Sequence, residues 1–242
     1  MWRRVRLEGL ERHLAHQLEH GREFFWHRLR WAAVSRYLPE GTFTLVDVGA
    51  GAGLVGELLR EQRPAAAYRF VEPIPFLEED LDRRYGAAAN ARGDDRYEGA
   101  AVVTLLDVLE HQADDRAFMA ELAGKLDPGA LLIVTVPASP RLWSRWDVAL
   151  GHHRRYDRGS FRRAVAGLPL ELVELDYLFP ELVPLAFVRK LAMRRPDAEA
   201  DVEFPELPAP ANELLYRIGL ASLRLRRAWP LGTSLLAVLR RS

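Results

Sequence analysis

The sequence contains no cysteine among its 242 residues. Disulfide bonds, zinc held by thiolates and a cysteine nucleophile are therefore excluded, and a metal ion would need histidine or carboxylate ligands. A surplus of positive charge is also missing, because 34 basic residues balance 34 acidic ones. Proteins that bind nucleic acids through their phosphates need such a surplus, so the balance predicts a partner other than nucleic acid.

Long apolar runs are absent as well. No stretch reaches the roughly 18 apolar residues that predict a transmembrane helix. The first residues, MWRRVRLEGLERH, lack the apolar centre of a secretory signal. We therefore expect a cytoplasmic protein. Contact with a membrane surface stays open for residues 178–228, whose predicted helices are apolar on one side and arginine-rich on the other.

Apolar runs alternate with helical patterns through most of the chain. Continuous runs predict strands buried on both faces of a parallel sheet, and strands that alternate with helices predict an α/β fold. We expect a Rossmann-like, doubly wound and mostly parallel sheet of seven strands, with a terminal antiparallel strand, N-terminal helices and a helical insertion before the last strand. The predicted strands are residues 43–49, 67–73, 88–91, 100–108, 130–138, 170–179 and 233–241.

A glycine-rich turn follows the first predicted strand in TLVDVGAGAGLVG, residues 44–56. Its second half spells the G-x-G-x-x-G of enzymes that bind NAD(P) through the pyrophosphate. Counted from Gly49, which follows the strand directly, that spacing fails at Leu54. Asp47 lies inside the strand, where its carboxylate would hydrogen-bond the turn and suit a cationic ligand better than a pyrophosphate.

The series Asp47-x-Gly-x-Gly-x-Gly resembles motif I of the class I S-adenosylmethionine (SAM) methyltransferases. LDPGALLIVTVPA, residues 126–138, resembles the strand-five signature of that family, with Ala130 in place of its second glycine. The segments LDVLEH (106–111) and GHHRRYD (151–157) resemble a bacterial branch with small-molecule or lipid-type acceptors. The resemblance implies SAM as the cofactor and S-adenosylhomocysteine as the product.

The resemblance also suggests three segments. Residues 1–41 would form an N-terminal helical lid, and residues 42–178 the SAM-binding core. Residues 179–242 would form a helical insertion, or cap, followed by the last strand of the core sheet. The oligomeric state is left open.

The cofactor site follows from the same family motifs. Glu72, at the end of the second strand, would accept both ribose hydroxyls, and Asp94 would contact the adenine amino group. The cofactor-binding residues implied are Asp47, Gly49, Ala50, Gly51, Glu72, Pro73, Asp94, Leu106 and Asp107.

The acceptor site is expected after the fourth and fifth strands, where polar residues gather. An imidazole titrates near pH ~6.5 and can accept a hydroxyl proton, so the catalytic candidates are His111, His152 and His153. The alternative for His111 is local packing, and the alternative for the arginines is pairing with nearby acids. The substrate-binding candidates are Trp143, Arg154, Arg155 and Tyr156.

Asp107-x-x-Glu110-His111 also resembles the start of a Mg²⁺ site in some O-methyltransferases, with His152 or His153 as a later ligand. Because many methyltransferases carry this five-residue motif without a metal, we expect none and keep Mg²⁺ as the alternative.

These features predict a SAM-dependent methyltransferase that acts, by O-methylation, on a small-molecule or lipid-like acceptor. The segment LDVLEH stands where amino-group DNA methyltransferases carry an Asn-Pro-Pro-Tyr motif, which argues against that class. Two alternatives remain: an NAD(P)-dependent oxidoreductase and a non-catalytic SAM-binding module.

Overall fold

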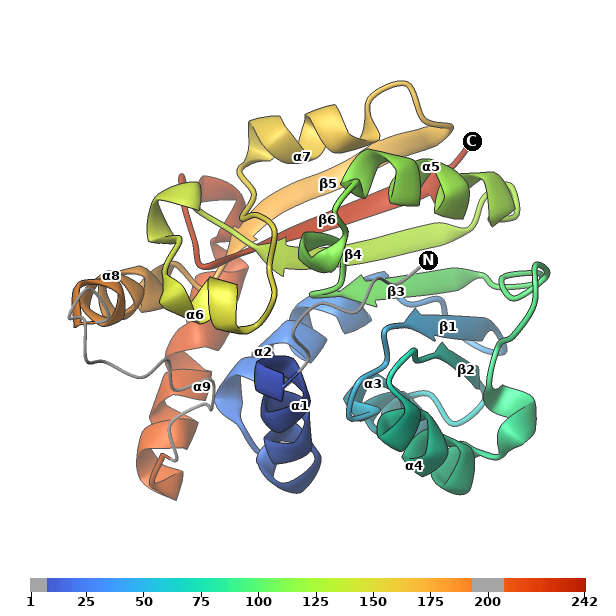
Figure 1. Cartoon of the computed structure of the whole chain (residues 1–242), viewed down its shortest axis with the longest axis horizontal. Coiled ribbons are helices and arrows are strands. Elements are labelled where there is room, and N and C mark those ends of the chain that lie inside the picture. Colours follow the sequence, from blue (N-terminus) through green and yellow to red (C-terminus); the bar gives the residue numbers. More distant parts are fainter. Residues whose placement is uncertain (1–7, 193–206) are drawn as a thin grey trace.

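A computed structural model describes residues 8–192 and 207–242, so residues 1–7 of the predicted lid and 193–206 of the predicted insertion lie outside the described part. One sheet of six strands forms its centre, in the order β2-β1-β3-β4-β6-β5 (Figure 1). Five strands run in one direction, and β6 runs opposite to them. The strands are β1 (Thr44–Val48), β2 (Ala67–Val71), β3 (Val102–Leu106), β4 (Leu131–Pro137), β5 (Leu170–Leu178) and β6 (Ser234–Arg241).

The α/β architecture and the antiparallel strand are confirmed, but the described residues form six strands and not seven. Residues 88–91 were expected to form the additional strand. They contain the end of a 3₁₀ turn, Ala87–Ala89, and a single parallel bridge between Asn90 and Phe70. Alanine is a weak strand former, and the Asn90 side chain binds Glu78 and Asp82 of the preceding helix, which holds this segment against the helix.

Helices cover both faces of the sheet (Figure 1). On one face, α5 and α7 pack against the strands, and on the other face α2, α3 and α9 do so. Burial on both sides explains why the central strands are continuous apolar runs. The helices are α1 (Glu8–His20), α2 (Phe25–Val34), α3 (Leu54–Gln62), α4 (Pro75–Tyr85), α5 (Asp115–Lys125), α6 (Arg145–Ala149), α7 (Arg158–Val165), α8 (Val183–Ala192) and α9 (Ala209–Arg224).

The late helix α9 docks on the early helix α2. A Cβ atom at Gly219 would lie 2.1 Å from Leu29 Cδ1, so the two helices approach more closely than any side chain at this position would allow. Asn212 accepts a hydrogen bond from the Phe25 N–H and donates one to the Glu23 carbonyl. Helices from the early and late parts of the chain therefore form one layer on this face of the sheet.

Every helix within residues 8–192 and 207–242 is too short or too polar to cross a lipid bilayer.

Candidate functional site

A cavity of about 620 Å³ opens at the carboxyl ends of the parallel strands. This edge of the sheet is where open α/β folds place their ligands. The glycine turn and the ends of β2 and β3 form one side of the cavity. The remaining walls come from helices α1, α2, α6, α8 and α9.

The chain reverses sharply where it leaves these strands. Gly49 after β1, Asp107 after β3, Ser139 after β4 and Phe179 after β5 all have a positive φ between 57° and 70°. Three of them are not glycine, and such backbone strain gathers at functional sites. At Gly49 a Cβ atom would also lie 2.5 Å from Val108 Cγ2, so only glycine fits.

The Glu72 carboxylate shapes the glycine turn from the neighbouring strand. Its Oε2 accepts the N–H of Gly51 at 2.7 Å, and its Oε1 accepts the N–H of Ile74 at 2.8 Å. The N–H groups of Gly49 and Ala50 point to the Val71 carbonyl. Burial raises the pKa of Glu72 to about 7, although the hydrogen bonds from the amides of Ile74 and Gly51 act to lower it.

Asp47 lines the same cavity but makes different contacts from those expected. It accepts hydrogen bonds from the Thr104 hydroxyl at 2.7 Å and the Tyr68 hydroxyl at 3.2 Å, and not from the turn backbone. Burial raises its pKa to about 6. Because the amides of Gly49, Ala50 and Gly51 are already engaged and the carboxyl groups of Asp47 and Glu72 face the cavity, this turn suits a pyrophosphate poorly, which disfavours the NAD(P) alternative.

Arg30, which the sequence analysis did not single out, supplies a cation to this end of the cavity. It extends from α2, lies over the Trp26 ring and forms an ion pair with Asp107 at the end of β3. Both ionic side chains line the cavity and remain partly exposed. A cation and carboxylates side by side match a zwitterionic ligand group, such as an amino acid.

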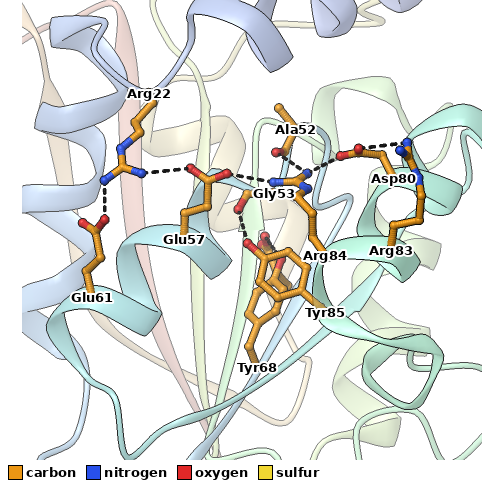
Figure 2. Close-up of polar contacts among 11 residues, drawn as sticks. Arg22, Ala52, Gly53, Glu57, Glu61, Tyr68, Asp80, Arg83, Arg84 and Tyr85 are labelled. Carbon is orange, nitrogen blue, oxygen red and sulfur yellow. Dashed lines mark hydrogen bonds and ion pairs between the residues drawn. The ribbon is translucent and has the colours of Figure 1, made fainter.

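A polar network holds the glycine turn from its outer side (Figure 2). Arg84 of α4 donates to the Ala52 carbonyl at 2.8 Å and to Glu57 at 2.8 Å, and it also pairs with Asp80. The hydroxyl of Tyr85 donates to the Gly53 carbonyl at 3.1 Å. The turn is therefore fixed by side chains on both of its sides.

Figure 2 also shows how this network reaches the N-terminal helices. Arg22, between α1 and α2, pairs with Glu61 and lies 3.9 Å from Glu57, both on α3. The α1–α2 connection is thereby tied to the helix that follows the glycine turn.

Three side chains with metal-ligand chemistry meet at the other end of the cavity: Glu110, His111 and His152. One ligand atom from each lies within 4.8 Å of the others. The His111 and His152 rings contact edge to face, with centroids 4.9 Å apart. Burial, followed by the neighbouring His152, lowers the pKa of His111 to about 3, so this imidazole is neutral at ordinary pH and is a weak base there.

Glu110 is the most buried member of this cluster. Its side chain has no exposed surface, and neither carboxylate oxygen has a hydrogen-bond partner from another described residue. Burial, with a smaller contribution from the Asp107 carboxylate, raises its pKa well above the ordinary value. Sequence reasoning named Glu110 among the polar groups after the fourth predicted strand and in the Mg²⁺ resemblance, but not among the catalytic candidates.

Asp147 at the start of α6 organises the loop beside this cluster. Its Oδ1 accepts Arg155 Nε at 2.7 Å and lies 3.0 Å from His152 Nδ1. Its Oδ2 accepts the Ser144 N–H at 2.9 Å in a capping box. The predicted substrate residue Arg155 thus lines the cavity, but its guanidinium group is already paired with Asp147.

Several predicted site residues lie outside the cavity lining. Arg154 pairs with Asp115 at 2.8 Å, and the buried Tyr156 donates a hydrogen bond to the same carboxylate at 2.8 Å. For Arg154 this arrangement corresponds to the alternative in the sequence analysis, in which the arginines pair with nearby acids. Asp94, the residue predicted to contact adenine, is 99% exposed and pairs with Lys125 at 3.3 Å. His153 is exposed, and Trp143 is half-buried beside the loop. The predicted residues that do line the cavity are Asp47, Gly49, Ala50, Gly51, Glu72, Pro73, Leu106, Asp107, His111, His152 and Arg155.

Solved structures share this fold at low sequence identity. A chain of the complex between the Haloferax volcanii Trm112 methyltransferase activator and the methyltransferase it binds is 18% identical, with a TM-score of 0.60 over 93% of this chain and 92% of that one. A SAM-dependent methyltransferase from Archaeoglobus fulgidus is 13% identical, with a TM-score of 0.52 over 88% and 94%.

The same fold also serves other chemistry. The [4+2]-cyclase SpnF is 14% identical, with a TM-score of 0.52 over 89% of this chain and 80% of that one. The shared fold alone therefore does not decide the reaction. No curated protein matches the sequence.

The sequence itself matches one family model, described as a methyltransferase domain, over residues 10–175. This span contains the glycine turn, Glu72 and the buried cluster at the far end of the cavity. The predicted recognition of a class I methyltransferase is confirmed. The chain belongs to this methyltransferase-domain family, and it is an enzyme that takes its methyl group from S-adenosylmethionine and releases S-adenosylhomocysteine.

Proposed function

We propose that the enzyme methylates a hydroxyl group on a small acceptor that also carries an apolar portion. The observation that carries this proposal is the single cavity that joins the glycine turn to the Glu110–His111–His152 cluster along walls contributed by α8. One end suits the methyl donor, the other end suits a polar reacting group, and Leu185 and Val188 of α8 add apolar side chains to the wall.

The donor end matches the parts of SAM in turn. The Glu72 carboxylate keeps unused lone pairs, which accept the ribose hydroxyls while the amides of Gly51 and Ile74 hold it in place. Arg30 receives the methionine carboxylate, and Asp47 and Asp107 lie where they attract the ammonium group. Asp47, Glu72 and Asp107 are all among the cofactor-binding residues that the family resemblance implies.

At the acceptor end, the buried cluster receives the hydroxyl. As its oxygen attacks the methyl carbon, the bond between sulfur and that carbon breaks and its electron pair stays on sulfur. The hydroxyl proton leaves to water, so the products are the methyl ether and S-adenosylhomocysteine. The protein contributes chiefly by aligning the oxygen with the sulfonium.

The apolar part of the acceptor has a matching surface on α8. Leu185 and Val188 line the cavity and are each 63% exposed, so the cavity opens beside apolar side chains. Phe187 and Leu191 of the same helix are also exposed. An alkyl or aromatic group that leaves the cavity here would cover them, which stabilises binding by about 25 cal/mol per Å² of buried apolar area.

The proposal can be tested by measuring how fast S-adenosylhomocysteine is produced with pairs of acceptors that differ in one feature. An alkyl-substituted phenol should react faster than its chain-free parent, and faster than the aniline that carries the same chain. Val188→Asp should raise KM for the alkyl phenol by about tenfold. Val173→Asp, at an exposed position of strand β5, should leave this KM unchanged. SAM binding without turnover of any acceptor, or turnover of the anilines alone, would contradict the proposal.

A further inference from the structure

We propose that Glu110, His111 and His152 bind a divalent transition-metal ion of the zinc class. The three ligand atoms already lie within 4.8 Å of one another, and all three residues line the cavity. Glu110 and His111 are adjacent on the 3₁₀ turn after β3, and His152 follows α6. Small side-chain rotations would bring the three atoms to the bond lengths of about 2.0–2.2 Å that zinc requires.

The buried carboxylate of Glu110 is an independent indication of a ligand. A carboxylate removed from water costs free energy unless hydrogen bonds or an opposite charge compensate it. Glu110 has neither within hydrogen-bond reach: its oxygens lack a partner from any other described residue, and the nearest basic atom is His152 Nε2 at 4.0 Å from Oε1. A cation between these side chains would provide the missing partner.

The surroundings of His152 have the arrangement typical of metal-binding histidines. Its Nδ1 lies 3.0 Å from Asp147 Oδ1, which leaves Nε2 directed toward Glu110. Asp147 is itself fixed by Arg155 and by the Ser144 backbone. A carboxylate that orients the second imidazole nitrogen in this way raises metal affinity by roughly 10–100-fold.

The donor set decides between metals. Magnesium prefers oxygen ligands, and the residue that would have supplied another oxygen, Asp107, pairs with Arg30 instead. Two imidazoles with one carboxylate suit zinc or a neighbouring first-row ion, and leave a coordination position open toward the cavity. An ion there would polarise the acceptor hydroxyl, a use that rests on the proposed function, whereas metal binding itself does not.

The full-length protein, stripped of metal with a chelator, tests the inference by calorimetric titration with ZnCl₂. Wild-type protein should bind Zn²⁺, and Glu110→Gln and His152→Gln should each weaken binding at least about tenfold. His153→Ala provides the matched control, because this exposed neighbour lies outside the cluster and its loss should leave the affinity unchanged. X-ray absorption of the zinc-loaded wild type should show nitrogen and oxygen ligands at about 2.0 Å, together with imidazole scattering from the more distant ring atoms.

Equal affinity of Glu110→Gln and wild type, or absence of imidazole scattering in the loaded wild type, would overturn the inference. The scattering experiment needs no variant, so it decides even if a substitution prevents folding. SAM binding and methyl transfer measured on the metal-free protein separate the two proposals. Full turnover without metal and no site-specific Zn²⁺ binding would contradict only the metal site, whereas Zn²⁺ binding without turnover of any acceptor would contradict only the proposed function.

Discussion

The N–H of Gly51 donates a hydrogen bond to the buried carboxylate of Glu72, 2.7 Å away. This bond couples the glycine turn after β1 to the end of β2, so the residue proposed to bind the ribose also holds the turn in shape. The ionisation of Glu72 should therefore affect both stability and cofactor binding.

The stability of the ligand-free protein should fall as pH rises toward neutrality. Burial raises the pKa of Glu72 from 4.5 to about 7, and that of Asp47 from 3.8 to about 6. The folded protein thus retains protons that the unfolded chain releases, and the resulting stabilisation, complete below about pH 4, is lost as pH rises through about 7. Thermal unfolding from pH 4.5 to 8 should show Tm declining in wild type and declining less in Glu72→Gln. Parallel curves for the two proteins would assign the effect to other groups.

Arg30 should matter for only one end of the cofactor. Arg30→Ala removes the cation proposed to bind the methionine carboxylate, so Kd for SAM should rise by about tenfold or more, the value of a hydrogen bond to a charged group. 5′-Methylthioadenosine lacks the amino acid end, and its Kd should stay constant. Arg28→Ala is the control, since Arg28 stacks over Tyr216 and pairs with Glu213 outside the cavity lining. Equal losses for both ligands would refute this assignment.

The outer network predicts different effects for two adjacent arginines. Arg84 holds the Ala52 carbonyl and Glu57, whereas Arg83 is 76% exposed and pairs only with Asp80 among the described residues. Arg84→Ala should raise Kd for SAM by roughly 3- to 10-fold, because a buried carbonyl loses its donor and the turn loosens. Arg83→Ala should change Kd by less than about twofold. Calorimetric titration with S-adenosylhomocysteine measures both values.

The contact between α9 and α2 predicts opposite effects of the same substitution at two helical glycines. Gly219→Ala should destabilise the protein by about 1–3 kcal/mol, because its Cβ would overlap Leu29. Gly124→Ala, on α5 with nothing within 4 Å of the new Cβ, should be neutral or stabilising by up to ~1 kcal/mol. Urea unfolding followed by circular dichroism gives both values. A Gly219→Ala protein as stable as wild type would mean that α9 is not held against α2 as described.

The strands could be predicted because burial on both faces leaves a plain signal in the sequence. The central strands are continuous apolar runs, and Asp47, Glu72 and Asp107 stand out because each is a carboxylate at or near the end of such a run. The alanine-rich segment at residues 88–91 carries no comparable packing requirement. Its apolar character came from small side chains, and the structure has one bridge there.

The rest of the site depends on contacts between distant parts of the chain. Arg30 and Asp107 are 77 residues apart, and nothing in the local sequence separates Arg30 from the other arginines nearby. In the loop GHHRRYD, sequence proximity suggested a shared role, yet the backbone directs His152 and Arg155 to the cavity and leaves His153 exposed. Only the fold decides which members of a polar run meet a ligand.

The position of β6 between β4 and β5 has a consequence for how the chain is made. Within the described parts of the chain, strand β5 pairs in the sheet with β6 alone, so this pairing cannot form until residues 234–241 have left the ribosome. Until then β4 and β5 both present open edges, which invite pairing with other chains. Completion of the sheet during synthesis is therefore a late event that depends on its most distant segment.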